Sequence, residues 1–279
     1  MTQPGTPPTT AFVLGGGGVL GAGEVGMLRA LLEAGVAPDL VVGTSVGALN
    51  GAFLAAEPTV EATVRLAAVW RELSEQGGVF AGSVGARLST ALRSRTHLHA
   101  SGPLRELLTT HLPVDRIEDL QVPFQCVAAA VERAAEHWFA SGPLVDAVLA
   151  SAAVPGLLPP VRIGEEHFLD GGLVNSIPVS RAVELGATTV WVLQVGRVEQ
   201  SLTVPTRPWE VALVAFEIAR RHRFARDMAT VPPGVTVHVL PTGDEAPTGV
   251  AQLRYRDVRQ IGRRVELARA ATAAYLAAL

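Results

Sequence analysis

The stretch 39–53, DLVVGTSVGALNGAF, changes character in its middle. An apolar, β-branched run ends at Gly43, a single hydroxyl follows at Ser45, and helix-forming residues begin at once. A serine between two glycines at such a corner matches the pattern G-x-S-x-G, in which the small residues Gly43 and Gly47 leave room for a sharp turn. The stretch predicts a nucleophile elbow that presents the Ser45 hydroxyl at a helix N-terminus, where developing negative charge is favoured.

The same corner has a structural alternative. A serine at the start of a helix commonly serves as the N-cap, and its side-chain oxygen then accepts a hydrogen bond from the helix backbone. A serine at its ordinary pKa is also a poor nucleophile, because it needs a base within hydrogen-bond distance. A catalytic role for Ser45 therefore depends on a base supplied by another part of the chain.

Short β-branched runs alternate along the chain with longer segments that carry apolar residues at helical spacing. The runs expected to be strands are AFVL (11–14), LVVG (40–43), FQCVAAAV (124–131), TTVWVLQV (188–195) and VTVHVL (235–240). This alternation is typical of parallel strands covered by helices. It predicts an α/β fold of three layers, α/β/α, around a central, mostly parallel sheet.

No linker clearly divides the chain, so residues 11–279 are expected to form one domain behind a flexible leader at 1–10. Two long helices are expected at 205–227 and 252–279. The segment 77–101 is rich in glycine, serine and arginine and has weak periodicity, so it is expected to cross the surface as an irregular segment.

The composition excludes several kinds of chemistry. All 23 cations are arginines, so the chain has no P-loop lysine, Schiff-base lysine or lysine base. Cys126 is the only cysteine, which excludes an internal disulfide and a cysteine zinc site, and its apolar neighbours predict a buried strand position. The net charge of −3 includes no long basic block, so nucleic acid is not an expected partner. No metal or other cofactor is expected.

The location of the protein is predicted from two segments. Residues 1–10 lack the basic and apolar regions of a signal peptide. The most apolar long stretch, 144–161, contains Asp146 and three prolines, which does not suit a membrane span. These features predict a soluble, cytoplasmic protein and leave peripheral contact with a membrane open.

A second glycine cluster, in LGGGGVLGAGEVGML (14–28), follows the first expected strand and opens a helix. Consecutive glycines let the backbone approach a ligand closely, and the helix N-terminus adds unpaired N–H donors, so the loop predicts an anion site. Gly16, Gly18 and Gly21 also match G-x-G-x-x-G, which leaves dinucleotide binding and a plain tight turn as alternatives. However, Asp39 comes before the second strand, the wrong end for the acid that binds ribose.

The base for Ser45 is sought among histidines and acids that follow it. His222 lies in a basic helical end and His238 inside a strand, so solvent exposure and packing suit them better than catalysis. Asp170, in HFLDGGLVNSIPV (167–179), is followed by two glycines that leave its carboxylate room to face another group. Aspartate before glycine is also common in structural turns, so both roles of Asp170 stay open on this evidence.

The combination of these motifs resembles the patatin-like phospholipase family. The resemblance runs in order through LGGGGVLGAGEVGML, GTSVGALNG, ASAAVPGLLPPVRI and LDGG with NSIPV, within residues 12–180. It implies a fatty-acyl ester of a lipid as substrate, Ser45 as nucleophile and Asp170 as its sole partner in a Ser–Asp dyad. It also implies an oxyanion loop formed by three glycines, Gly16, Gly17 and Gly18.

One position departs from the family pattern. The glycine loop of the family commonly reads G-G-G-x-R/K-G, whereas Leu20 occupies the basic position here. A cation that would help to bind an anion or to position the loop is missing from the motif. Leu20 therefore keeps open a catalytically silent protein that only binds lipid, beside the nucleotide-binding alternative.

The expected helix 205–227 combines apolar and basic side chains. Its large apolar residues are Trp209, Leu213 and Phe216, and its basic end contains Arg220, Arg221 and Arg223. These residues would suit an acyl channel or a contact with a lipid surface. The preferred interpretation is an amphipathic helix that packs on the core and ends in solvated arginines.

Overall fold

The computed structural model describes residues 9–75, 99–195, 201–243 and 259–279. Eight strands in these ranges form one sheet with the order β5-β6-β3-β2-β1-β7-β8, and β4 pairs with β3. Parallel pairing joins five successive strands, β3 (Phe124–Ala130), β2 (Leu40–Thr44), β1 (Thr10–Leu14), β7 (Thr189–Leu193) and the edge strand β8 (Thr236–Val239). Antiparallel pairing adds β4 (Ala135–Phe139), β5 (Val161–Ile163) and β6 (Glu166–Asp170).

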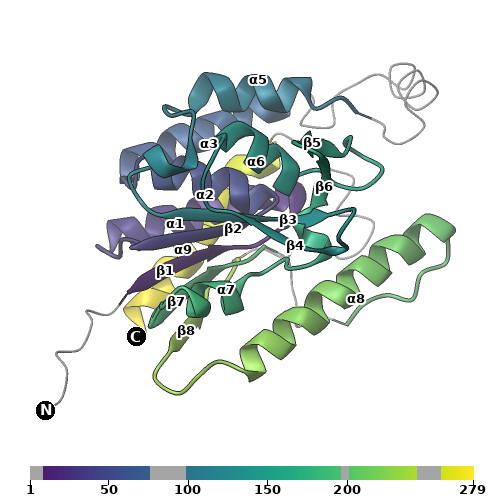
Figure 1. Ribbon diagram of the computed structural model, residues 1–279. Coiled ribbons are helices and arrows are strands. Elements are labelled where there is room, and N and C mark those ends of the chain that lie inside the picture. The colour runs from purple at the N-terminus through teal and green to yellow at the C-terminus, as the bar shows by residue number, and fades with distance from the viewer. Residues whose placement is uncertain (1–8, 76–98, 196–200, 244–258) are drawn as a thin grey trace, which may run out of the picture.

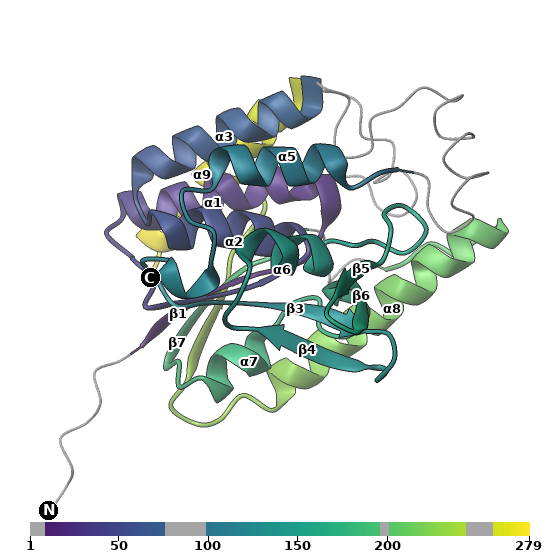
Figure 2. The same ribbon diagram turned by 45° about the horizontal axis from the view of Figure 1, so that its top comes forward.

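Helices cover both faces of the sheet (Figures 1 and 2). One face carries α1 (Ala22–Glu33), α2 (Val46–Ala56), α3 (Val60–Glu75), α5 (Gly102–His111), α6 (Leu144–Ser151) and α9 (Arg259–Ala277). The other face carries α7 (Val179–Glu184) and α8 (Pro208–Ala229). Short 3-10 turns are η1 (Gly18–Gly21), η2 (Ile117–Asp119) and η3 (Gly171–Leu173). The predicted three-layer α/β/α fold with a mostly parallel central sheet is confirmed.

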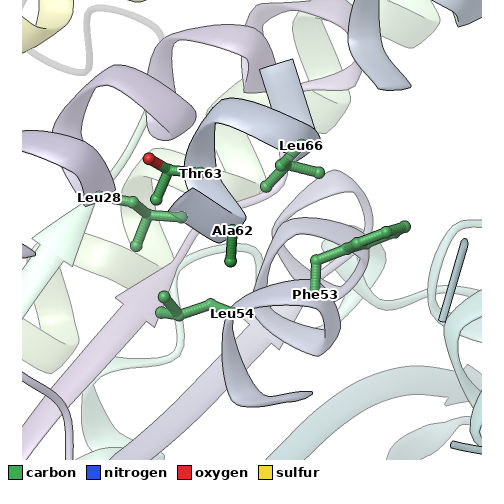
Figure 3. A pocket seen from close by; sticks show the side chains of 6 residues that line it. All are labelled: Leu28, Phe53, Leu54, Ala62, Thr63 and Leu66. Carbon is green, nitrogen blue, oxygen red and sulfur yellow. The ribbon is translucent and has the colours of Figure 1, made fainter. Parts of the chain in front are cut away.

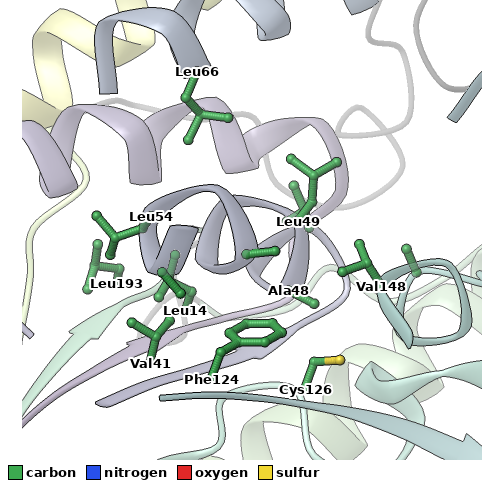
Figure 4. Packing of buried hydrophobic residues seen from close by; sticks show 14 of the residues in the cluster. Leu14, Val41, Ala48, Leu49, Leu54, Leu66, Phe124, Cys126, Val148 and Leu193 are labelled. Atoms are coloured by element: carbon green, nitrogen blue, oxygen red, sulfur yellow. The ribbon is translucent and has the colours of Figure 1, made fainter. Parts of the chain in front are cut away.

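Alternate residues of the central strands face two separate cores. In β1, Phe12 and Leu14 pack into the core beneath α1 and α2, whereas Ala11 and Val13 pack into the core on the α7 side. Figure 4 shows the first core, in which Leu14 and Cys126 lie beneath α2. Cys126 is fully buried in β3, as predicted, and burial raises the pKa of its thiol. Burial on both faces explains why these strands are almost continuously apolar.

Strand β3 brings two distant parts of the chain together. Its first half pairs in parallel with β2, up to Thr44 opposite Val127. Its second half pairs with β6, beginning with Asp170 opposite Ala128, while β4 occupies the other edge of β3. The strands β2 and β6 therefore share one edge of β3, and their C-terminal ends meet at Thr44 and Asp170.

Both long helices expected near the C-terminus are present as α8 and α9. Most of the expected irregular segment 77–101 and most of the expected leader 1–10 lie outside the described residues, and β1 begins at Thr10. The prediction of a single domain over 11–279 stays a prediction. Within the described ranges, no helix is both long and apolar enough to cross a bilayer.

Candidate active site

Ser45 lies between β2 and α2 in a backbone conformation that residues other than glycine rarely adopt. Its φ is 56° and its ψ is −120°, a strained geometry that the surrounding structure must hold in place. The Ser45 side chain makes no capping hydrogen bond to α2. Its hydroxyl instead donates to Asp170 Oδ2 at 2.6 Å. Ser45 therefore occupies the N-cap position, but its hydroxyl is not used as a cap.

The glycines on either side of Ser45 lie against backbone. A Cβ at Gly43 would lie 2.5 Å from the Gly47 carbonyl oxygen, and a Cβ at Gly47 would lie 2.2 Å from the Leu14 carbonyl oxygen. Neither position accepts a side chain unless the backbone moves. The sharp turn at Ser45 thus depends on close contact between α2 and the end of β1.

Asp170 ends β6 and is almost completely buried. Its Oδ1 accepts a hydrogen bond from the Gly172 N–H at 2.7 Å, which caps η3, and its Oδ2 faces Ser45. One carboxylate therefore caps the turn through Oδ1 and binds the Ser45 hydroxyl through Oδ2, so the structural role in the turn does not exclude a catalytic one. Gly171 permits the tight turn, since a Cβ there would lie 2.2 Å from the Val127 carbonyl oxygen.

The environment of Asp170 changes its acidity. Burial raises the pKa of Asp170 to about 6, although hydrogen bonds from Ser45 and Gly172 act in the opposite direction. A carboxylate with this pKa is still ionised at neutral pH and is a stronger base than an ordinary aspartate. The Ser45 and Asp170 pair therefore has the geometry and acidity of a nucleophile and its base.

The C-terminal end of α6 supports both members of this pair. The Ser45 N–H donates to Ser151 Oγ at 2.9 Å, and the Asp170 N–H donates to the Ala153 carbonyl oxygen at 2.9 Å. A further bond joins the Thr44 hydroxyl to the Asn175 carbonyl oxygen at 2.8 Å. The segment ASAAVPG (150–156) belongs to the family pattern, but its sequence indicates no role in the site, because these contacts link residues far apart in the chain.

The glycine loop passes beside Ser45. A Cβ at Gly16 would lie 3.5 Å from Ser45 Cβ, and Gly18 has a φ of 57°. The Gly16 N–H donates to the Ser176 carbonyl oxygen at 2.8 Å, so this amide is already engaged. The N–H groups of Gly17 and Gly18 donate to no other described residue, which leaves them as candidate oxyanion donors.

A buried polar network attaches the glycine loop to α2. Asn50 donates to the Gly21 carbonyl oxygen at 2.9 Å and to Glu24 Oε2 at 2.8 Å, and it accepts a hydrogen bond from Trp70 Nε1 at 2.9 Å. Burial raises the pKa of Glu24 well above its usual value, against the opposing effects of Asn50 and Arg220. This network was not predicted from the sequence.

The two histidines considered as bases lie elsewhere. His222 is exposed on α8. His238, on β8, stacks on Trp191 with ring centroids 4.2 Å apart and lies 3.1 Å from the Tyr275 hydroxyl through Nδ1. Solvent exposure and strand packing, as predicted for His222 and His238, are confirmed.

Helix α8 lies over the Asp170 turn, and only part of its basic end is exposed to solvent. A Cβ at Gly172 would lie 2.8 Å from Phe216 Cζ, so the half-buried Phe216 ring packs against this turn. The prediction of solvated arginines is wrong for Arg220, which is buried, and Arg223 is half-buried between Glu136 and Asp227. The side chains of Trp209 and Leu213 lie outside the described residues.

Other parts of the described chain offer no second reactive site. The hollow in Figure 3 lies among α1, α2 and α3, at the far end of α2 from Ser45. Its lining is apolar except for Thr63, whose hydroxyl donates to the Val60 carbonyl oxygen. No cluster of three or more metal-ligating side chains occurs in the described ranges. Asp39 directly precedes β2, where it accepts a hydrogen bond from the Thr10 N–H at the opposite end of β1 from the glycine loop.

Comparisons with known proteins agree on one family. The model of the family "Patatin-like phospholipase" matches residues 12–183. Patatin-like phospholipase domain-containing protein 6 of Mus musculus is 33% identical over 198 residues, which cover 70% of this chain and 14% of that protein. Lysophospholipase nte1 of Aspergillus terreus is 30% identical over 196 residues, which cover 69% of this chain and 12% of that protein.

The match therefore spans a small fraction of these curated relatives' own length. Among solved structures, VipD from Legionella pneumophila aligns with a TM-score of 0.48 at 16% identity, covering 98% of this chain and 67% of that one.

Proposed function

Because the chain belongs to the patatin-like phospholipase family, we propose that it is an acyl hydrolase that cleaves fatty-acyl esters of lipids through Ser45 and Asp170. One observation carries this proposal, the 2.6 Å hydrogen bond between the Ser45 hydroxyl and the buried Asp170 carboxylate. The strained backbone of Ser45 and the raised pKa of Asp170 support it. Neither step of the proposed mechanism uses a metal or another cofactor.

Acylation would begin with attack of Ser45 Oγ on the ester carbonyl carbon, while the hydroxyl proton passes to Asp170 Oδ2. The carbonyl oxygen would become an oxyanion facing the N–H groups of Gly17 and Gly18. Collapse of this tetrahedral intermediate would break the bond to the alcohol group. The leaving alcohol would take the proton from Asp170 and leave the acyl group on Ser45.

Deacylation would reverse the roles with water in place of the alcohol. Asp170 would take a proton from water as the water oxygen attacks the acyl carbonyl carbon. The second oxyanion would meet the same amides, and its collapse would release the fatty acid. Ser45 would recover its proton from Asp170. A single base thus serves both steps.

The substrate class is the less specific part of this proposal. One relative is named a lysophospholipase, and the chain covers only 12% of that protein. We propose a fatty-acyl ester of a glycerophospholipid or lysophospholipid. A cytoplasmic location with peripheral membrane contact belongs to the same proposal and is tested by cell fractionation with a salt wash.

The proposed nucleophile is tested by covalent labelling. Incubation with a fluorophosphonate is expected to add one phosphonyl group to Ser45, because such reagents react with activated serines. Peptide mass spectrometry locates the adduct, and hydrolysis of a short-chain nitrophenyl ester is measured before and after labelling. Loss of hydrolysis in proportion to the Ser45 adduct is the expected result.

Other outcomes of the labelling experiment favour the alternatives. An adduct on another serine together with lost hydrolysis would move the nucleophile away from Ser45. No adduct, no hydrolysis and thermal stabilisation by NAD(P) would favour a nucleotide-binding module. No adduct with binding to phospholipid vesicles would favour the silent lipid-binding protein suggested by Leu20.

The pH dependence of hydrolysis reports the proposed base. Because Asp170 must be ionised and its pKa is about 6, kcat/KM is expected to be level above pH 7 and to fall about tenfold per unit well below pH 6. Initial rates from pH 4.5 to 8.5 check this. Repeating the profile in a mixed organic solvent separates a carboxylic acid from a histidine, since only the former creates charge on ionisation. A midpoint near 4 would contradict the raised pKa of Asp170, and a midpoint unmoved by the solvent would contradict a carboxylic acid as the base.

A further inference from the structure

The glycine loop carries no charge of its own. Residues 15–21 read GGGGVLG, and Leu20 is 5% exposed, so its side chain occupies an apolar environment. The two segments that support this loop are nevertheless contacted by a cation. That cation is Arg220, in the middle of α8, which lies on the opposite face of the sheet from α1 and α2.

The guanidinium of Arg220 is buried, and each of its three nitrogens donates a hydrogen bond. Its side chain is 5% exposed. Its Nε donates to Ser176 Oγ at 3.0 Å, Nη2 donates to the Val195 carbonyl oxygen at 3.4 Å, and Nη1 donates to Glu217 Oε1 at 3.0 Å. Desolvation of a buried ion pair offsets much of its attraction, so this arrangement is weak as a source of stability. It does fix the relative positions of its partners, because the guanidinium is planar and rigid.

Ser176 contacts both Arg220 and Gly16. The Ser176 carbonyl oxygen accepts the Gly16 N–H at 2.8 Å, and Ser176 Oγ would lie 3.1 Å from a Cβ at Gly16. A Cβ at Gly16 would in turn lie 3.5 Å from Ser45 Cβ. A single residue, Ser176, therefore lies between the guanidinium of Arg220 and Gly16, which is next to Ser45 in space.

Val195 provides a second connection, to Gly17. A Cβ at Gly17 would lie 2.3 Å from Val195 Cγ2 and 3.2 Å from the Val195 carbonyl oxygen. That carbonyl oxygen is the one that accepts from Arg220. The direction of the Gly17 and Gly18 amides thus depends on a segment that Arg220 holds.

We propose that Arg220 is the positioning residue of the oxyanion loop, holding Gly16 through Ser176 and Gly17 through Val195. This inference rests on the proposed function, because it assigns Arg220 to the reaction at Ser45. Arg220 touches the supports of the loop, so its loss should weaken oxyanion stabilisation and lower kcat with little change in KM.

The test compares Arg220→Met with Arg226→Met, a control on the same helix whose side chain is exposed. Loss of one oxyanion donor typically lowers turnover by about 10²–10³, and a displaced loop should lose less. We expect kcat for a nitrophenyl ester to fall about 10- to 100-fold in Arg220→Met, with KM within about threefold of wild type. The rate of fluorophosphonate labelling at Ser45 should fall in parallel. Arg226→Met should keep the wild-type kcat.

A merely structural role of Arg220 predicts a different result. The melting temperature of Arg220→Met would fall, but its kcat and labelling rate, measured well below that temperature, would stay within twofold of wild type. This result would overturn the inference. Failure of the proposed function looks different again, because the wild-type protein itself would then give no Ser45 adduct.

A second variant covers the case in which Arg220→Met does not fold. Ser176→Ala removes the hydroxyl that accepts from Arg220, but it keeps the Ser176 carbonyl bond to Gly16 and the pair between Arg220 and Glu217. Its kcat is expected to fall about 3- to 10-fold, a smaller loss because one connection remains. Where both variants fold, the double variant should lose little more than Arg220→Met alone, since both changes break one pathway. Full additivity, or an unchanged kcat in Ser176→Ala, would contradict the Ser176 connection.

Discussion

Asp170→Asn is expected to abolish ester hydrolysis while making the protein more stable at neutral pH. Loss of the proposed base should lower kcat/KM by about 10³ or more, since a positioned base contributes about 10²–10⁴ and the amide cannot accept the Ser45 proton. The amide can still accept the Gly172 N–H and face the Ser45 hydroxyl, so the turn is preserved. The measurements are nitrophenyl ester hydrolysis and urea unfolding of the variant and the wild type.

The gain in stability follows from the pKa of Asp170. Burial raises this pKa from 3.8 to about 6, so the folded protein holds a proton there that the unfolded chain releases. The stability that this proton contributes is present below pH 3.8 and is lost as pH rises through 6. The variant avoids that loss. Its free energy of unfolding should exceed that of wild type by up to about 3 kcal/mol above pH 7, at about 1.4 kcal/mol per pKa unit.

The control for this prediction is Asp119→Asn, at an exposed position in η2. It should leave both hydrolysis and unfolding close to wild type. Intact mass is measured with each assay, because the change at position 170 creates a thermolabile Asn–Gly sequence that can revert to aspartate. Retention of more than a tenth of wild-type activity at the correct mass would exclude Asp170 as the base. Equal stability of variant and wild type across pH 4–8 would show that the carboxylate is not strained by burial.

The central strands were predictable because both of their faces are buried. Runs such as 11–14 and 190–193 are apolar throughout, which is typical of parallel strands between two helical layers. The antiparallel strands were not predicted, because they are partly exposed and mix polar with apolar residues. Strand β4 includes Glu136 and His137, and β6 includes Glu166 and His167.

Ser45 and Asp170 could each be identified from the local sequence, but their contact in space could not. Ser45 and Asp170 stand out because glycines beside each one indicate a tight turn. They are 125 residues apart, and they meet because β2 and β6 end against neighbouring residues of β3. Only the resemblance to a family, taken from several motifs at once, implied that pairing before the structure did.

The burial of Arg220 shows where sequence patterns stop being informative. The segment RRHRF (220–224) looks like the solvated end of an amphipathic helix. Its first arginine is buried because α8 packs over Ser176 and Val195, which come from other parts of the chain. The only unusual feature near the glycine loop in the sequence is Leu20 at the position where the family has a cation. That feature does not indicate which residue elsewhere in the chain would contact the loop.

Gly47→Ala should destabilise the protein by about 3–5 kcal/mol, although helix propensity alone favours alanine by about 1 kcal/mol. A Cβ at Gly47 would lie 2.2 Å from the Leu14 carbonyl oxygen and 2.8 Å from the Gly15 carbonyl oxygen. These are backbone atoms of the central strand and the glycine loop, so α2 must move away from β1. Since whole domains are stable by only about 5–15 kcal/mol, much of the variant should be unfolded or insoluble. Urea unfolding and soluble yield measure this.

Two further alanine substitutions, one on α9 and one on α2 itself, separate the effect of the contact from the effect of losing a glycine. A Cβ at Gly262, on α9, would meet no atom within 4 Å, so Gly262→Ala should stabilise the protein by up to about 1 kcal/mol. A Cβ at Gly51, on α2, would lie 3.0 Å from Val41 Cγ1, a side-chain atom that can shift, so Gly51→Ala should have an intermediate effect. The loss of stability is thus expected to increase from Gly262→Ala to Gly51→Ala to Gly47→Ala, because each new methyl group in that order meets atoms that are less able to move. If Gly47→Ala were as stable as wild type and still reacted with fluorophosphonate at Ser45, the tight turn between β1 and α2 would not be what holds the nucleophile in place.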